Sequence, residues 1–358
     1  MTARTCPRLP PVASARRGTI TVCSASGNGP VVSRRQLGAA TLFLGGSSLV
    51  PPPVSADDTP VGGGSGGGLA LVTGCNTGIG LEVVRGLASR GYEVVLGCRT
   101  VDKGRAAAAV IAAGVPGAKL RVLDVPLELG DLRSVAAYAD AVRRLDTPLS
   151  LLVNNAGIMA APYMTTAQGH ESHIGVNHLG HFALSNALLE PLRAGRARVV
   201  NVSSVAAYGD SLRLDDLDWR QRKYDPWMGY FASKLANVLF TRSLAAREPL
   251  LVTHAVHPGV VNTDLARYIL PADWQDGKAK DPERSAAVAR LLGLRSPTEG
   301  AAPVLWVALD AAAGKDSGRF FLDAAQEAPA LFRPGGGSDG MLRAEGLWQR
   351  SQEMMLAA

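Results

Sequence analysis

A phenol and an ammonium group lie one helical turn apart in the segment 228–240, which reads MGYFASKLANVLF. Good helix formers and the helical spacing of the apolar residues predict an amphipathic helix with Tyr230 and Lys234 on the same side. A free tyrosine has a pKa of about 10, too high for efficient proton transfer at neutral pH, and an adjacent cation lowers it. The spacing therefore predicts that Lys234 makes Tyr230 a usable acid or base, as carbonyl reduction requires.

A glycine-rich segment, TGCNTGIG at 73–80, follows an apolar run and precedes a helical pattern. Glycines between a strand and a helix permit a tight turn and let a pyrophosphate approach the backbone N–H groups at the start of the helix. In this context the segment predicts a dinucleotide-binding turn. Its candidate binding residues are Gly74, Asn76, Thr77, Gly78, Ile79 and Gly80.

The end of the second predicted strand indicates which dinucleotide is bound. NAD-specific folds place an acid there to bind the ribose 2′-hydroxyl. Here Cys98 occupies that position and Arg99 follows it. A guanidinium can bind a 2′-phosphate with two hydrogen bonds, so NADP(H) is favoured over NAD(H).

The next two predicted strands end in further candidate cofactor contacts. The LDV sequence is expected to end the third strand and to place Asp124 beside the adenine. The NNAG sequence ends the fourth strand, and its asparagine and glycine suit a tight backbone turn along the cofactor. The residues expected there are Asn155, Ala156 and Gly157.

Short apolar runs alternate with helical patterns over most of the chain. Strands are expected at 69–73, 93–97, 120–125, 149–153, 198–202, 250–256 and 319–322. Helices are expected near 79–90, 101–113, 131–145, 172–193, 229–248 and 298–311. This alternation predicts an α/β fold, a single Rossmann-type doubly wound parallel sheet of about seven strands with helices on both faces. Ligands bind such sheets at the carboxyl ends of the strands.

The set TGCNTGIG, NNAG, Tyr-x-x-x-Lys and HPGVV (257–261) resembles the short-chain dehydrogenase/reductase family in order and spacing over nearly all of 69–323. The resemblance implies that Ser204 hydrogen-bonds a substrate carbonyl and that Asn177 holds the helix and the water of a proton relay. It also implies that Lys234 binds the nicotinamide ribose. The residues implied on the nicotinamide side are Pro258, Gly259, Val261 and Thr263.

The chain resembles the retinol-dehydrogenase-like branch of that family in four stretches: the long insertion between the candidate serine and tyrosine (205–229), YFASKLANVLFTRSLA, HPGVVNTDL and the ending EGLWQRSQEMM. Trp219, Tyr224 and Trp227 could form an apolar lid over a bulky substrate, or the insertion could be a surface loop packed by its own aromatic residues. The branch implies a small hydrophobic aldehyde, ketone or alcohol as substrate. The resemblance also leaves room for a homo-oligomer and for peripheral membrane contact.

Three functions are compatible with these motifs. The favoured one is an NADP(H)-dependent oxidoreductase that interconverts a hydrophobic carbonyl compound and its alcohol, with Tyr230 as general acid or base. The alternatives are a non-catalytic NADP(H)-binding redox sensor of a plastid membrane complex and a pigment reductase of the protochlorophyllide type. A pure sensor has no need of Ser204 together with Tyr230, and the chain lacks the cysteines typical of the pigment reductase near the substrate.

The first 56 residues differ in composition from the rest of the 358-residue chain. They contain arginine but neither lysine nor acid, so the formal net charge of +6 belongs to them and the remainder is balanced. A balanced body predicts no nucleic-acid partner. The leader is typical of an organelle transit peptide, and Arg34 and Arg35 before an apolar run resemble a twin-arginine signal. We expect a chloroplast protein, in the thylakoid lumen or the stroma.

The expected organisation is a targeting leader at 1–56, a glycine-rich linker at 57–68, an NADP-binding catalytic domain at 69–323 and a C-terminal extension at 324–358. No metal site is expected, although four histidines are close in sequence: His170, His173, His178 and His181. Cys75 and Cys98 end adjacent predicted strands beside the cofactor site. Either small buried side chains or a redox pair would fit that pattern.

Overall fold

The computed structural model describes residues 67–268, 294–324, 326–328 and 339–357. The predicted targeting leader (1–56) lies outside the described residues, as does all but the end of the predicted linker. None of the described helices is long and apolar enough to cross a membrane.

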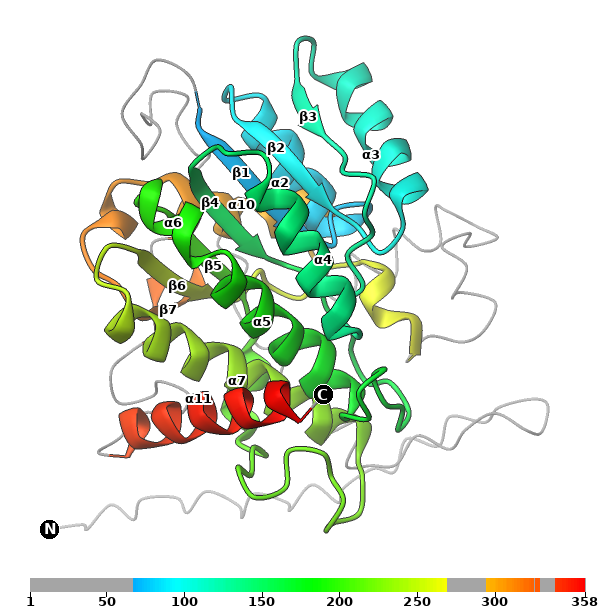
Figure 1. Ribbon diagram of the computed structural model, residues 1–358, viewed down its shortest axis with the longest axis vertical. Helices are drawn as coiled ribbons and strands as arrows, with labels where there is room; N and C mark the ends of the chain where they lie inside the picture. The colour runs from blue at the N-terminus through cyan, green and yellow to red at the C-terminus, as the bar shows by residue number, and fades with distance from the viewer. Residues whose placement is uncertain (1–66, 269–293, 325, 329–338, 358) are drawn as a thin grey trace, which may run out of the picture. The chain divides into compact units, whose positions relative to one another are not determined.

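The described residues form one eight-stranded sheet in the order β3-β2-β1-β4-β5-β6-β7-β8 (Figure 1). The first seven strands are parallel and β8 pairs antiparallel with β7, so the predicted parallel sheet is confirmed with one short edge strand added. The strands are β1 (Leu69–Thr73), β2 (Glu93–Gly97), β3 (Lys119–Arg121), β4 (Leu149–Asn154), β5 (Arg198–Val202), β6 (Val252–Val256), β7 (Arg319–Asp323) and β8 (Gln326–Glu327).

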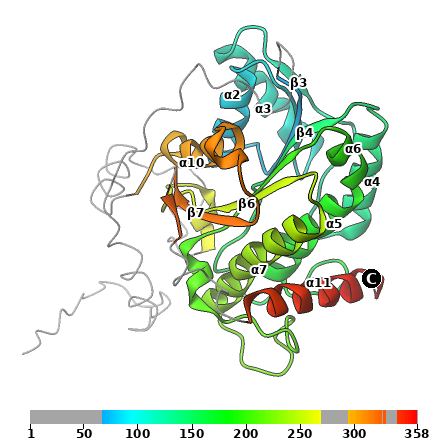
Figure 2. The same cartoon turned by 90° about the vertical axis from the view of Figure 1, so that its left-hand side faces the viewer.

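Helices cover both faces of the sheet, as the alternation predicts (Figure 2). One face carries α2 (Gly78–Ala88), α3 (Val101–Gly114) and α10 (Pro297–Leu309). The other carries α4 (Leu132–Arg143), α5 (Gly180–Ala187), α6 (Leu189–Ala194) and α7 (Pro226–Arg247). The described 3₁₀ segments are η2 (Val205–Gly209), η3 (Asp264–Tyr268) and η4 (Ala312–Gly314).

Strand β1 shows how the two cores arise from one sequence. Successive side chains of a strand point to opposite faces of a sheet. Ala70 and Val72 join the core under α2 and α3, whereas Leu69 and Leu71 join the core under α4 and α5. An unbroken apolar run therefore suits a strand that is buried on both faces.

The predicted helix at 172–193 is interrupted in the structure. It begins as a π-helical turn, η1 (Ile174–Leu179), and continues as α5 and α6 with a break at Leu188. Asn177 lies within the π-helical turn and uses its side-chain amide to hold the loop after β4. Such turns are common at functional sites.

The predicted C-terminal extension contains a helix that the sequence patterns did not indicate, α11 (Gly340–Leu356). Figures 1 and 2 both show α11 alongside α7. Its Trp348 packs edge-on against Phe182 of α5, with ring centroids 4.8 Å apart, and lies 6.0 Å from Phe240 of α7. This part of the extension is therefore packed into the core of the catalytic fold.

Candidate active site

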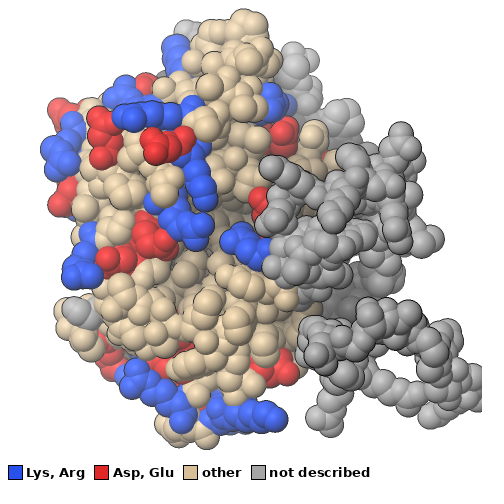
Figure 3. Space-filling view, turned by 90° about the vertical axis from the view of Figure 1, so that its right-hand side faces the viewer, with Lys and Arg blue, Asp and Glu red and all other residues tan. Residues whose placement is uncertain are grey.

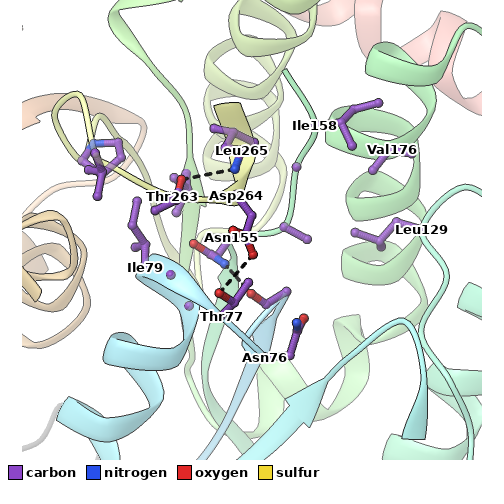
Figure 4. A pocket seen from close by; sticks show the side chains of 18 of the residues that line it. Asn76, Thr77, Ile79, Leu129, Asn155, Ile158, Val176, Thr263, Asp264 and Leu265 are labelled. Atoms are coloured by element: carbon purple, nitrogen blue, oxygen red, sulfur yellow. Dashed lines mark hydrogen bonds between the residues drawn. The ribbon is translucent and has the colours of Figure 1, made fainter. Parts of the chain in front are cut away.

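A cavity of about 400 Å³ opens at the carboxyl ends of the central strands, where the fold predicts a ligand. Figure 4 shows its interior, with Leu129, Ile158 and Val176 on one side and Ile79 across from them. Seventeen of the residues predicted for the site line it: Gly74, Asn76, Thr77, Gly78, Ile79, Gly80, Arg99, Asn155, Ala156, Gly157, Ser204, Tyr230, Lys234, Pro258, Gly259, Val261 and Thr263.

The glycine-rich turn has the geometry that a dinucleotide needs. Gly74 and Gly78 have φ angles of 63° and 59°, which other residues rarely adopt. A side chain at Gly80 would meet the Asn155 amide at 2.5 Å. Helix α2 then starts at Gly78 with no side-chain cap from Thr77 and no acid in its first turn. The backbone N–H groups of its first turn are therefore not capped by the Thr77 side chain and could bind a diphosphate, so the residues of this turn fit a dinucleotide.

A buried hydrogen-bond network fixes the NNAG turn against β1. The Thr73 hydroxyl accepts hydrogen bonds from the backbone N–H groups of Asn155 and Ala156, both at 3.0 Å, and lies 2.8 Å from His181 Nε2. His181 Nδ1 lies 3.0 Å from the Asn177 carbonyl oxygen. Burial lowers the pKa of His181 to about 4, so the ring is neutral at pH 7. Each group is satisfied if His181 donates from Nδ1 and accepts at Nε2.

Two cations lie at the end of the cavity beyond β2. Arg99 lines it with more than half of its side chain exposed, and its Nε lies 4.0 Å from a Glu128 carboxylate oxygen. Lys103, in the first turn of α3, lines the same end. Figure 3 shows basic side chains interspersed with acidic ones on one face of the molecule. On that face the described basic side chains do not form a broad basic surface.

Tyr230 and Lys234 both line the cavity and are almost fully buried. Burial raises the pKa of Tyr230 to about 12, and a hydrogen bond with the Ser204 side chain opposes this shift. Burial also lowers the pKa of Lys234 to about 8. The Lys234 ammonium donates to the Val202 carbonyl at 3.0 Å and lies 5.7 Å from the centroid of the tyrosine ring.

The expectation that Lys234 brings the pKa of Tyr230 below its usual value is therefore wrong. Burial disfavours the phenolate, and this effect is larger than the opposing effect of the hydrogen bond with Ser204.

Asn177 is fully buried and is not among the described residues that line the cavity, but it contacts Ile158, which is one of them. Its side-chain oxygen accepts from the Ile158 N–H at 2.8 Å, and its side-chain N–H groups donate to the Ile158 carbonyl at 3.0 Å and to the Ser233 hydroxyl at 2.9 Å. Asn177 thus joins the loop after β4 to the helix that carries Tyr230 and Lys234. This is the helix-holding role that the family resemblance implies.

Asp124 is predicted beside the adenine, but it is not among the described residues that line the cavity. Strand β3 ends at Arg121, so Asp124 lies in the loop beyond it instead of at the end of the strand. Its side chain is 86 % exposed and forms an ion pair of 2.7 Å with Arg105. The carboxylate therefore points to solvent.

Two aromatic residues of the 205–229 insertion pack on each other, and Trp227 packs on Phe231 of α7. Trp219 and Tyr224 have ring centroids 5.5 Å apart, and the Arg222 guanidinium lies 3.6 Å above the Trp219 ring. The Tyr224 hydroxyl donates to the Ala161 carbonyl at 2.9 Å. None of Trp219, Tyr224 and Trp227 is among the described residues that line the cavity. The described contacts favour the self-packed loop over the lid.

Each of the four clustered histidines contacts polar groups of the protein. His170 contacts Asp218 and the Met354 carbonyl, His173 contacts Glu171, and His178 contacts Ser351. Across the described ranges, no group of three or more potential metal-ligating side chains converges.

Ser203, which the sequence offers as an alternative to Ser204 although the second serine matches the family better, also lines the cavity. Sequence patterns missed several other lining residues: Gly97, Lys103, Leu127, Glu128, Leu129, Ile158, Val176, Val202, His257, Asp264, Leu265 and Arg267. Most lie directly beside a motif, so the positions flanking each motif were the available signal. Asp264 is an example: it follows Thr263 and accepts a hydrogen bond of 3.4 Å from Thr77, which joins η3 to the glycine-rich turn (Figure 4).

Comparison with known proteins assigns this arrangement to a family. The family model described as short chain dehydrogenase matches residues 68–274. The chain belongs to the short-chain dehydrogenase family. Its eight-stranded α/β fold, with the glycine-rich turn and the tyrosine–lysine pair at one cavity, is consistent with that assignment.

Similar members of the short-chain dehydrogenase family include retinol dehydrogenases. Retinol dehydrogenase 12 of Homo sapiens is 47 % identical over 203 residues, which is 56 % of this chain and 63 % of that protein. Retinol dehydrogenase 11 of Mus musculus is 40 % identical over 260 residues, 71 % of this chain and 77 % of that protein. The first of these matches thus spans less than two thirds of its relative.

Solved structures are also similar to this chain. An uncharacterised protein from Mycobacterium paratuberculosis superposes with a TM-score of 0.62 at 33 % identity, covering 85 % of this chain and 98 % of that one. A protein described as an NAD(P)-dependent gluconate 5-dehydrogenase from Beutenbergia cavernae, with bound NADP, superposes at 0.55 with 26 % identity, covering 73 % and 97 %.

Proposed function

We propose that this protein is an NADP(H)-dependent oxidoreductase that interconverts a hydrophobic aldehyde or ketone and its alcohol. The observation that carries the proposal is the convergence of Tyr230, Ser204 and Lys234 in the same cavity as the glycine-rich turn. Arg99 and Lys103 at the far end of that cavity favour the phosphorylated dinucleotide, because two cations can neutralise a 2′-phosphate.

In this proposal the chain's own residues hold the substrate and supply the proton. When bound, the reduced dinucleotide supplies the hydride for a carbonyl carbon. Ser204 donates a hydrogen bond to the carbonyl oxygen. Tyr230 then delivers its phenolic proton to that oxygen as negative charge develops on it, and the Lys234 ammonium stabilises the phenolate that remains.

The protonation state of Tyr230 favours reduction at neutral pH. With a pKa of about 12 the phenol keeps its proton, and it still donates readily because an alkoxide is far more basic than a phenolate. Oxidation of an alcohol would require Tyr230 to begin as a phenolate, which burial disfavours.

The proposed substrate class comes from the relatives and from the cavity wall. Relatives named as retinol dehydrogenases suggest a hydrophobic alcohol and aldehyde. Leu129, Ile158 and Val176 give one side of the cavity an apolar surface (Figure 4). A panel of aliphatic and aromatic aldehydes of increasing length, assayed with NADPH, would test this class.

The tyrosine role is tested by replacing Tyr230 with Phe. We expect kcat to fall by about 10²–10⁴-fold while the NADPH Kd changes little, because only the proton donor is removed. Tyr208→Phe is the matched control, since Tyr208 is a partly exposed tyrosine that does not line the cavity. Full turnover by the Tyr230→Phe protein would contradict the proposal.

We also propose a chloroplast location, on the basis of the acid-free, arginine-containing leader. A fluorescent fusion of the full chain, compared with one that lacks residues 1–56, measures this directly. Cytosolic fluorescence from both fusions would contradict it. Stroma and lumen are distinguished by protease protection of isolated thylakoids.

A further inference from the structure

Two buried thiols meet beneath the cofactor cavity. Cys75 Sγ lies 3.5 Å from Cys98 Sγ, within hydrogen-bond distance for sulfur. Cys75 follows β1 and Cys98 follows β2, neighbouring parallel strands whose register pairs Thr73 with Gly97. Both are free cysteines, and Cys98 retains 4 % exposure whereas Cys75 has none.

Both cysteines lie between residues that line the cofactor cavity. Gly74 and Asn76 flank Cys75, and Gly97 and Arg99 flank Cys98. A displacement of either cysteine would therefore move a neighbour that lines the proposed dinucleotide site.

Helices α2 and α3 are packed against the two cysteines, so we expect any movement of the cysteines to be directed toward the cavity. A Cβ built at Gly80, at the start of α2, would meet the Cys75 backbone at 2.9 Å. A Cβ built at Gly104 of α3 would meet Cys98 Sγ at 3.8 Å. The helix starts thus lie close against both cysteines.

We propose that Cys75 and Cys98 form a reversible disulfide on reaction with a peroxide, and that this bond weakens NADP(H) binding. The coupling to the cofactor rests on the proposed NADP(H) site, whereas the bond itself does not.

The reaction is balanced by the two thiols and one peroxide. The thiolate of Cys98 attacks a peroxide oxygen, which breaks the O–O bond and gives a sulfenic acid and water or an alcohol. The Cys75 sulfur then attacks the Cys98 sulfur, forms the S–S bond and expels water. The two electrons come from the two sulfurs and the two protons end in the products. Reduction by an external dithiol reverses the oxidation.

The environment assigns the first step to Cys98. The hydrogen bond from Cys75 lowers the pKa of the Cys98 thiol, whereas burial raises the pKa of the Cys75 thiol. A thiolate is the reactive form. Cys98 is also the more exposed of the two.

Disulfide formation brings the two sulfurs closer together than they lie in the structure. A disulfide joins sulfurs about 2.05 Å apart, so the two sulfurs must approach by about 1.5 Å. The two sulfurs can approach by rotation of the side chains, and because the core side of both cysteines is packed against α2 and α3, we expect the strand ends bearing Gly74 and Arg99 to follow them. The diphosphate turn and the proposed 2′-phosphate contact would be displaced together.

The disulfide is tested by peptide mapping of the full chain. The native protein is treated with hydrogen peroxide, free thiols are blocked with N-ethylmaleimide, and the protein is digested with trypsin. Trypsin cuts after Arg85 and Arg90 and so separates the two cysteines. A linked peptide that disappears with dithiothreitol supports the proposal. Its absence after peroxide treatment, with Cys75 and Cys98 both blocked by maleimide, overturns it.

The coupling is tested by the NADPH Kd of reduced and oxidised protein, measured from nucleotide fluorescence. We expect a rise of at least about 10-fold on oxidation of the wild type. The Cys75→Ser and Cys98→Ser proteins should show no such rise, although they keep the leader cysteines Cys6 and Cys23. An unchanged Kd in disulfide-linked protein overturns the coupling. Failure of the reduced protein to bind NADPH would refute the proposed function and leave the disulfide result standing.

Discussion

The side-chain amide of Asn177 donates a hydrogen bond of 2.9 Å to the hydroxyl of Ser233, a residue between Tyr230 and Lys234 on α7. Ser233 in turn donates to the Tyr230 carbonyl at 2.8 Å. The π-helical turn that carries Asn177 is thus connected to the catalytic helix by one buried hydroxyl.

Ser233→Ala should destabilise the protein by about 1–3 kcal/mol, because an Asn177 N–H is left buried without an acceptor. It should also lower kcat several-fold, since α7 loses its tie to the loop after β4. Ser243→Ala is the matched control, a substitution on the same helix. The buried Ser243 hydroxyl has no hydrogen-bond partner among the described residues, so its loss should be nearly neutral. Urea denaturation and steady-state kinetics measure both effects, and equal losses in the two variants would contradict the prediction.

The kcat/KM of carbonyl reduction should fall as pH rises through about 8. Burial lowers the pKa of Lys234 to about 8, so its charge is present below that pH and lost above it, and the emerging phenolate then loses its stabilising cation. Tyr230 keeps its proton throughout, because its pKa is about 12. Lys234→Arg keeps the charge over this range and should remove the decline in whatever activity it retains. A flat wild-type profile between about pH 6.5 and 9.5 would show that this charge is not needed.

Arg99→Ala and Lys103→Ala should each raise the NADPH Kd by about 10–100-fold, which corresponds to the loss of one charge-assisted hydrogen bond. The NADH Kd should change little, because NADH has no 2′-phosphate. Arg105→Ala is the control: Arg105 pairs with Asp124 and does not line the cavity. Equal effects on the two nucleotides would mean that these cations do not contact the 2′-phosphate.

Trp348→Ala should destabilise the protein by about 3–5 kcal/mol, as large aromatic-to-alanine substitutions in cores do. Trp348 is 7 % exposed, packs on Phe182 and lies under the Arg247 guanidinium at 4.4 Å. Leu342→Ala, on the same helix and 72 % exposed, should change stability by less than about 0.5 kcal/mol. Denaturant midpoints compare the two. A small effect at Trp348 would show that α11 is not part of the cooperative core.

Local patterns were enough to predict the parts of the site that lie within one element. The glycine-rich turn was predictable because each glycine answers a local requirement, the tight turn and the approach to the start of α2. The Tyr-x-x-x-Lys spacing was predictable for the same reason, since helical periodicity alone places the two side chains on one side. The alternation of apolar runs and helical patterns indicated a doubly wound parallel sheet and the edge of it at which ligands bind.

Contacts between distant segments decided the rest. The pKa of Tyr230 depends on how deeply the folded protein buries it, and Asp124 turns to solvent because β3 ends early and Arg105 lies within reach. The docking of α11 and the 3.5 Å approach of Cys75 to Cys98 are contacts between residues far apart in the chain. The helix around Asn177 is interrupted by a π-helical turn, which the local pattern did not indicate. Periodicity and motif spacing report only on neighbours along the sequence. Desolvation and side-chain pairing are set by which surfaces the fold brings together, and only the tertiary structure determines those.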